Sequence, residues 1–238
     1  MFNLQKYKIQ LISVPGTEKN VENITQEFTA ILENINDQTA LISVPNCHWT
    51  DGGLIDLLQL SNECKNKDIA LTIDGTQSVG AMPVDIQNIK PDLLVVSGYK
   101  WCLGPYSLGA AYIDKKYHDG SPIEHNWMAK YPLPEDNYVP NMTKYEDFTI
   151  ENARRFDFGL RGNFHLMPVF EESLSLINRL SPEYIYAYVG KLNEEIIKNI
   201  QASSIKDMGK VMGWLKPRIQ GRADMGSVSS AVKQRLGV

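Results

Sequence analysis

Two residues of opposite charge, Asp74 and Lys100, stand where the chain can carry out chemistry. Asp74 directly follows the apolar run at residues 69–73, and Lys100 lies in the segment SGYKWCLGP at residues 97–105, after the apolar run at 92–96. A lysine amine forms a Schiff base with an aldehyde, and a carboxylate can hydrogen-bond a protonated ring nitrogen. The pair therefore predicts a site in which one heteroaromatic ring lies between an acid and an amine.

Each of the two residues also has an ordinary structural interpretation. Asp-Gly is a common turn pair, so Asp74 before Gly75 can open a turn or cap a short helix. A lysine at a strand end usually lays its stem along apolar surface and keeps its ammonium in water. Lys100, however, lies between Tyr99 and Trp101 beside a Gly-Pro turn, where desolvation favours a reactive neutral amine. The occurrence of both residues together favours the chemical interpretation.

Neighbouring polar side chains can bind the remainder of such a ligand. Ser97 can donate its hydroxyl to a phosphate oxygen, and the phenol of Tyr99 can give a second hydrogen bond. Alternatively, Ser97 satisfies the strand end and Tyr99 packs with its hydroxyl in water. Gln77 can contact a phenolic oxygen on the ring, or face solvent at the start of a helix.

Alternating strand and helix patterns place these residues within a fold. The apolar runs before Asp74 and Ser97 are nearly continuous, as is typical of strands buried on both faces of a mainly parallel sheet. In such α/β sandwiches ligands gather at the carboxyl ends of the strands, where both residues are expected. The predicted strands are 7–12, 39–44, 69–73, 92–96 and 108–113, and the predicted helices between them are 24–35 and 54–65.

The pattern changes in the second half of the chain. Prolines and aromatic residues are frequent from 115 to about 148, which predicts an irregular stretch of the kind that covers a site. Helical periodicity returns over 163–179, and Pro182 indicates the start of a second helix. We predict a partial large domain over residues 1–160. Residues 161–238 are predicted to form bridging helices and an incomplete small α+β domain.

Composition excludes several classes of protein. The chain has 238 residues, of which 43% are hydrophobic, and a net charge of -4 without a Lys/Arg run, which argues against nucleic acid as a partner. No apolar stretch approaches a bilayer span and no secretory signal begins the chain, so we expect no membrane partner and a cytoplasmic location. The three cysteines, Cys47, Cys64 and Cys102, show no CxxC spacing and predict reduced thiols rather than a metal site.

The motifs resemble the large domain of the class V aminotransferase family. Four of them occur in the expected order: DGTQSVG at 74–80, PD at 91–92, SGYKW at 97–101 and LGP at 103–105. The segments at 44–52 and 156–164 also resemble family segments, so the similarity covers roughly residues 40–180. This family has the fold-type I architecture of pyridoxal-phosphate enzymes. It includes cysteine desulfurases, kynureninases, serine and alanine-glyoxylate aminotransferases and an isopenicillin N epimerase-like branch.

The resemblance implies pyridoxal 5'-phosphate as the cofactor and a role for each residue of the site. Lys100 would form the Schiff base, and Asp74 would pair with the pyridinium nitrogen. Gln77 would contact the ring oxygen, while Ser97 and Tyr99 would hold the phosphate. The resemblance also implies a homodimer, because such sites are completed across a two-fold interface.

His48 and several departures from the family pattern bear on these implied roles. His48 can approach the ring or substrate, or remain a neutral, hydrogen-bonded histidine beside Trp49. Tyr99 stands where desulfurases usually carry histidine, which is more similar to kynureninases. Desulfurases need a cysteine in a later loop and none follows Cys102, which argues against desulfurase activity. The family's ring-stacking residue, its phosphate-binding turn and its carboxylate-binding arginine are not recognised in this sequence.

The sequence therefore predicts a pyridoxal-phosphate-dependent class V aminotransferase-like protein that acts on a small amino acid by transamination, epimerisation or elimination. The alternative is a truncated, catalytically weak or inactive fragment that serves as a binding or structural partner. A nicotinamide oxidoreductase and a serine hydrolase are disfavoured. No GxGxxG follows the early strands, and the segment at 75–80 misses the nucleophile-elbow spacing by one residue.

Overall fold

The computed structural model describes residues 22–49, 52–124, 152–158 and 163–219, together with residues 226, 228, 229, 232, 233 and 236. The strand predicted at 7–12 and most of the irregular stretch up to residue 148 lie outside these ranges.

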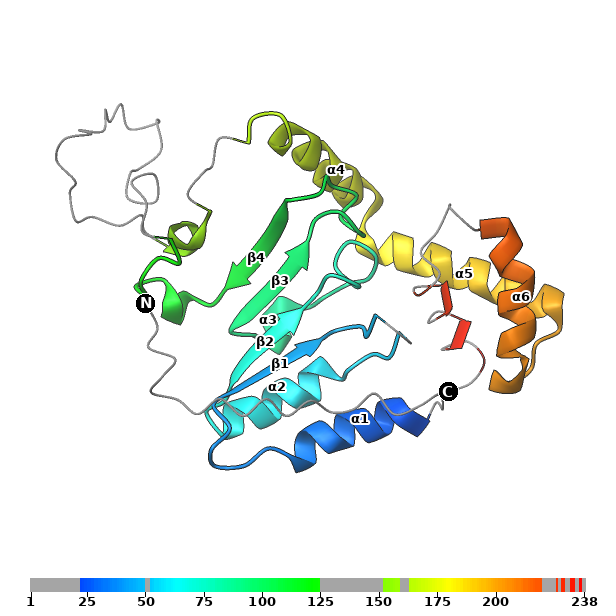
Figure 1. Cartoon of the computed structure of the whole chain (residues 1–238), viewed down its shortest axis with the longest axis horizontal. Coiled ribbons are helices and arrows are strands. Elements are labelled where there is room, and N and C mark those ends of the chain that lie inside the picture. Colours follow the sequence, from blue (N-terminus) through cyan, green and yellow to red (C-terminus); the bar gives the residue numbers. More distant parts are fainter. Residues whose placement is uncertain are drawn as a thin grey trace.

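A four-stranded sheet forms the centre of the fold (Figure 1). Its strands follow one another in chain order: β1 (Leu41–Pro45), β2 (Ala70–Asp74), β3 (Leu93–Ser97) and β4 (Gly109–Ile113). The first three are parallel, and β4 runs antiparallel to β3. A parallel pair needs a long crossover connection, and no helix separates β3 from β4. The prediction of a mainly parallel sheet is confirmed.

Three helices in the first half connect or flank the parallel strands: α1 (Glu22–Glu33), α2 (Leu57–Asn66) and α3 (Ile86–Ile89). An aspartate caps the start of each connecting helix. The Asp56 carboxylate accepts from the Gln59 N–H at the start of α2, and Asp85 accepts from Asn88 N–H at the start of α3. These caps satisfy backbone donors that a helix start leaves without partners.

One face of the sheet carries the main hydrophobic core. Alternate strand residues are buried there because side chains of a strand point to opposite faces in turn. They pack against α2 through Leu60 and Cys64, and against the later helix α4 through Phe170 and Ile177. The buried strand residues are Ile42, Val44, Leu71, Ile73, Leu94 and Val96.

The opposite face of the sheet is only partly covered. Leu41 is 56% exposed, and Thr72 and Val95 on the neighbouring strands are half-buried. Among the described residues the strands are thus fully buried on one face and partly buried on the other, within the mainly parallel sheet with helices that we expect. A continuous apolar run shows that both faces can be buried, but it does not show that both covering layers are present.

The described residues after 163 are helical. They form α4 (Met167–Leu180), α5 (Pro182–Ile200) and α6 (Met208–Ile219). Pro182 occupies the first turn of α5, as its sequence predicts, and the Ser181 hydroxyl accepts from Tyr184 N–H. The predicted partial α+β domain is thus represented by helices alone in this part of the chain. None of the described helices combines the length and apolar character needed to cross a membrane.

A second hydrophobic cluster lies among the last helices. Figure 1 shows α5 leading from α4 away from the sheet towards α6. The C-terminal part of α5 and α6 pack together with residues near the end of the chain. The buried members of this second cluster are Ile200, Val211, Leu215, Val232 and Leu236.

Candidate functional site

The carboxyl ends of β1, β2 and β3 meet at one edge of the sheet. Pro45 lies in register with Asp74, and Asp74 with Val95. The Asn46 N–H donates to the Asp74 carbonyl over 3.0 Å, and the Gly75 N–H donates to the Val95 carbonyl over 2.8 Å. Backbone hydrogen bonds therefore join the first residues after β1 and β2 to the neighbouring strand.

Asp74 and Ser97 are linked through Thr76. The Thr76 N–H donates to Asp74 Oδ1 over 2.9 Å, and Thr76 Oγ1 accepts from the Ser97 N–H over 3.1 Å. Asp74 thus takes the turn-forming role that its sequence allows. Its side chain is also exposed, so the carboxylate can bind a ligand at the same time.

Lys100 lies in a tight turn that directly follows β3. The Leu103 N–H donates to the Lys100 carbonyl over 3.0 Å, and the Gly104 N–H donates to the Gly98 carbonyl over 2.8 Å. Lys100 is half-buried, and its Nζ lies 5.9 Å from the centroid of the Tyr99 ring. The expected desolvation of the amine is therefore partial, because an aromatic face borders it while solvent still reaches it.

Tyr99 is itself supported by a second tyrosine. Its ring stacks on the ring of Tyr106 with centroids 4.6 Å apart and an interplanar angle of 17°. Tyr99 remains 40% exposed. Stacking fixes the plane of the ring and leaves its hydroxyl able to reach a ligand.

The loop after β2 packs directly on the lysine turn. Gly80 has a φ of +96°, and a Cβ at this position would lie 2.5 Å from the Trp101 carbonyl oxygen. The Cys102 thiol approaches the Val79 carbonyl at 3.7 Å, and Ser78 in the same loop as Val79 is fully buried. Only glycine permits this close approach, which brings the Asp74 loop and the Lys100 turn together.

His48 and Gln77 lie in the loops after β1 and β2. The His48 N–H donates to the Gly53 carbonyl and its own carbonyl accepts from Gly52 N–H, both over 2.8 Å. Both side chains are half-buried. The structure places His48 at the carboxyl edge of the sheet.

Asn46 is a candidate that our sequence interpretation missed. It directly follows β1, it is only 7% exposed, and its carbonyl accepts from the Ile55 N–H over 3.1 Å. The signal was available, because Asn46 is the polar residue at the end of a strand, as Asp74 and Ser97 are.

The buried thiols are poor nucleophiles. Burial raises the pKa of the Cys102 thiol above its ordinary value. Burial also raises the pKa of Cys64, and the negative charge of Asp92 adds to that effect. Both thiols are therefore predominantly protonated at neutral pH. The described residues contain no group of three or more His, Cys, Asp or Glu side chains that could hold a metal ion.

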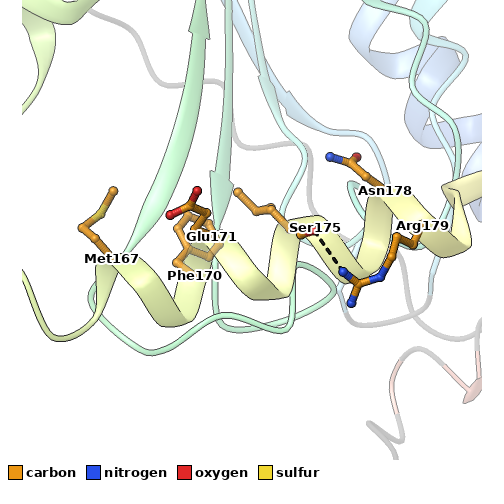
Figure 2. A pocket seen from close by; sticks show the side chains of 7 residues that line it. Met167, Phe170, Glu171, Ser175, Asn178 and Arg179 are labelled. Carbon is orange, nitrogen blue, oxygen red and sulfur yellow. Dashed lines mark hydrogen bonds between the residues drawn. The ribbon is translucent and has the colours of Figure 1, made fainter.

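A large open hollow lies along α4, apart from the strand ends. Its volume is about 700 Å³, and Figure 2 shows the lining side chains along this helix. The Arg179 guanidinium donates to Ser175 Oγ over 3.2 Å. Phe170 both lines the hollow and packs on the lysine turn, whereas none of the residues predicted for the site lines it. The lining residues are Met167, Phe170, Glu171, Leu174, Ser175, Asn178 and Arg179.

Comparison with protein families gives two matches on different parts of the chain. The family described as aminotransferase class-V matches residues 5–125, slightly more than half of the chain. The family described as Yqey-like protein matches residues 158–236. Enzymes of class V use pyridoxal phosphate, so the predicted family and the cofactor of this fold are confirmed.

Curated relatives include cysteine desulfurases. The cysteine desulfurase IscS of Shewanella denitrificans is 34% identical over 86 residues, which cover 36% of this chain and 21% of the relative. The Plasmodium berghei protein PbSufS is 26% identical over 185 residues, which cover 75% of this chain and 32% of the relative. The chain thus spans about a fifth to a third of the length of these relatives. The matched fold is of the cysteine desulfurase-like type.

Solved structures agree on the fold. The cysteine desulfurase CsdA from Escherichia coli superposes with a TM-score of 0.60 at 15% identity, over 74% of this chain and 42% of that chain. The cystine C-S lyase C-DES, in complex with its reaction product cysteine persulfide, gives a TM-score of 0.60 at 19% identity. The match covers 74% of this chain and 45% of that chain. At such identities the likeness establishes the fold alone.

Proposed function

The chain belongs to the aminotransferase class-V family, and we propose that it binds pyridoxal 5'-phosphate through Lys100 and acts on a small sulfur-containing amino acid. The observation that carries this proposal is the joining of three strand ends, which gathers a carboxylate, an amine and hydroxyl groups at one edge. This donor set fits a cofactor that has a ring nitrogen, an aldehyde and a phosphate.

The proposed roles follow from the chemistry of the side chains. When bound, pyridoxal phosphate supplies an aldehyde for an amine and a ring that withdraws electrons from bonds at the substrate's α-carbon. The Asp74 carboxylate would hold the proton on the ring nitrogen. Lys100 would anchor the cofactor, and its amine would then move a proton at the α-carbon.

The remaining site residues would orient the cofactor. We propose that Ser97 and Tyr99 donate hydrogen bonds to its phosphate. Gln77 would donate to the phenolic oxygen of the ring, and Asn46 joins it as a candidate from the neighbouring strand end. His48 would lie towards the ring or the substrate. The homodimer and the cytoplasmic location that the resemblance and composition imply belong to this proposal.

We propose elimination as the reaction branch. Proton removal by Lys100 would be followed by cleavage of the Cβ–S bond, and the sulfur would leave with the electron pair, as hydrosulfide from cysteine or as cysteine persulfide from cystine. The remaining three-carbon unit would take up water and leave as pyruvate and ammonia. Cys64 and Cys102 are buried and predominantly protonated, so neither is proposed as a sulfur acceptor. A route that releases sulfur to solvent needs no acceptor thiol. The relatives' names favour sulfur chemistry over transamination.

The alternative remains a fragment that binds the cofactor without turnover.

A turnover assay separates the two. Purified protein with pyridoxal phosphate is incubated with L-cystine, L-cysteine or L-alanine, and the sulfide, persulfide and pyruvate formed are measured. The Lys100→Ala variant is assayed in parallel. Pyruvate with reduced sulfur from cystine or cysteine supports the elimination branch. No product from a protein that still carries the cofactor supports the fragment, and a pyruvate yield unchanged by Lys100→Ala would overturn the role of Lys100.

A further inference from the structure

We infer that Phe170 and Ser173 of α4 are positioning residues for Lys100, holding the turn at 98–104 so that the amine points to the strand-end site. This inference rests on the proposed function of Lys100. The residues it names touch the turn rather than the reacting atoms. They belong to the segment matched by the Yqey-like model, outside the class V match.

The ring of Phe170 fills the space left by two glycines that flank Lys100. A Cβ on Gly98 would lie 3.0 Å from Cε2 and Cζ of Phe170, and a Cβ on Gly104 would overlap the same ring more closely. Phe170 is only 6% exposed, so its ring is held in the core while it contacts the turn. The two glycines and the ring therefore form one packed unit around the lysine.

Ser173 holds the same turn by a hydrogen bond. Its Oγ lies 2.9 Å from the Leu103 carbonyl oxygen and 2.9 Å from the Val169 carbonyl oxygen in its own helix. One hydroxyl proton serves one acceptor at a time, so the bond to Leu103 competes with a local one. Leu103 has a φ of +54°, which an L-residue with a Cβ adopts only when its surroundings hold it there.

The loop after β2 packs on this turn through Gly80, but part of the turn stays open to solvent. Leu103 is 55% exposed and Tyr99 is 40% exposed on either side of Lys100. A turn with exposed side chains and a left-handed residue opens easily unless a rigid element packs on it. The hydrophobic contact of α4 with the glycines provides that element. Loss of the contact is expected to let the amine move away from the site.

The first experiment compares Phe170→Ala with Val169→Ala, a neighbouring exposed position on the same helix. Hydrogen exchange of residues 98–108 is measured in the cofactor-free protein. Borohydride trapping of pyridoxal phosphate then gives the share of label on Lys100. We expect Phe170→Ala to speed hydrogen exchange in the turn at least tenfold and to lower the share of label on Lys100 several-fold. In Val169→Ala both the exchange rate and the labelling should match those of the natural protein. Equal exchange and equal labelling in both variants would overturn the inference.

Further variants of Phe170 and of two serines on α4 distinguish loss of these specific contacts from general unfolding. Phe170→Leu keeps the core filled and is expected to restore most of the Lys100 labelling and the position of the visible absorption band. Ser173→Ala is expected to speed exchange at Leu103 and Gly104 a few-fold, and Ser175→Ala to leave it unchanged. If Ser173→Ala and Ser175→Ala behave alike, the hydroxyl does not hold the turn.

A double substitution tests the contact itself. Gly104→Ala places a methyl group against the Phe170 ring and is expected to reduce Lys100 labelling several-fold in the otherwise natural protein. In the Phe170→Ala background the same substitution should have a much smaller effect, because the clash is gone. An equal effect of Gly104→Ala on Lys100 labelling in both backgrounds would contradict the contact between Gly104 and Phe170. If natural protein does not label at Lys100, the proposed function fails, while the exchange contrast still decides whether α4 holds the turn.

Discussion

Asp74 shows how one side chain can serve both structure and chemistry. Its Oδ1 accepts from the Thr76 N–H, which closes the turn after β2, and the residue is still exposed at the site edge. A carboxylate has acceptor positions on both oxygens, so the turn does not consume it. The structural and chemical interpretations that the sequence leaves open therefore describe the same residue.

Asp74→Asn is predicted to weaken pyridoxal phosphate binding about 10- to 100-fold, because a hydrogen bond to a charged group contributes roughly 1.5–3 kcal/mol. Asparagine keeps an acceptor for Thr76, so the turn is retained and the charge alone is lost. Absorption titration with the cofactor measures the affinity. Asp56→Asn, at the cap of α2, is the control and should bind normally, and equal affinity of Asp74→Asn would remove the proposed pairing with the ring nitrogen.

Several individual residues were predictable from the sequence, and others were not. Asp74, Ser97 and the lysine turn could be placed at the strand ends because apolar runs end there. Phe170 could not, because its contact with Gly104 joins residues 66 positions apart and no local pattern encodes it. The stacking of Tyr106 on Tyr99 is likewise a property of the folded turn.

At the scale of elements, Asp92 joins the starts of β2 and β3. Its carboxylate accepts from the Leu71 N–H over 2.7 Å and from the Tyr117 hydroxyl over 2.8 Å, and it pairs with Lys116 over 2.5 Å. Burial alone would raise the pKa of Asp92, but the hydrogen bonds from Lys116, Leu71 and Tyr117 outweigh it and lower the pKa. The ionised form is thus favoured by folding.

A lowered folded-state pKa makes stability depend on pH in one direction. The contribution of Asp92 is fully present above its unfolded pKa, about 3.9, and is lost as the pH falls through the lower folded value. Asp92→Asn is predicted to reduce the free energy of unfolding at pH 7 by about 1–3 kcal/mol and to cost less below pH 4. Urea unfolding across pH measures this difference. Asp85→Asn should be nearly neutral as a control, and a pH-independent loss in Asp92→Asn would contradict the linkage.

Most elements could be predicted because their periodicity is local. The four described strands and helices α1, α2, α4 and α5 lie within a few residues of their predicted positions. Helix α6 was missed because Gly209, Gly213 and Pro217 weaken its helical character. Tertiary packing in the second cluster nevertheless overrides this low propensity. The apolar residues of α6 that join the cluster recur at helical spacing: Met208, Val211, Met212, Leu215 and Ile219.

At the scale of the whole molecule, the described residues form two hydrophobic clusters, and α4 packs in the first although it lies after the division that we propose near residue 160. The first cluster joins the sheet, α2 and α4, and the second joins the end of α5 with α6. The two family matches cover residues 5–125 and 158–236, so α4 belongs to the second match while it packs in the first cluster. Helix α5 runs from α4 to the second cluster, and the bridging role predicted for the helices after residue 160 stays a prediction.

Leu215→Ala is predicted to destabilise the second cluster by about 2–5 kcal/mol, since Leu215 is only 2% exposed and its loss leaves a cavity. Hydrogen exchange should rise in α6 and the end of α5 and stay unchanged in β2 and β3. Leu71→Ala, in the first cluster, is the reciprocal control and should show the opposite pattern. Faster exchange throughout the chain in Leu215→Ala would show a single cooperative unit instead.

The central claim is that Lys100 is the amine that takes the cofactor, and one measurement tests it directly. The protein is incubated with pyridoxal phosphate at a stoichiometric ratio, reduced with borohydride, digested and mapped by mass spectrometry. We predict that the label concentrates on Lys100 and disappears with the visible absorption band in Lys100→Arg. A label spread evenly over exposed lysines such as Lys67 and Lys90, with Lys100 unmodified, would contradict the account.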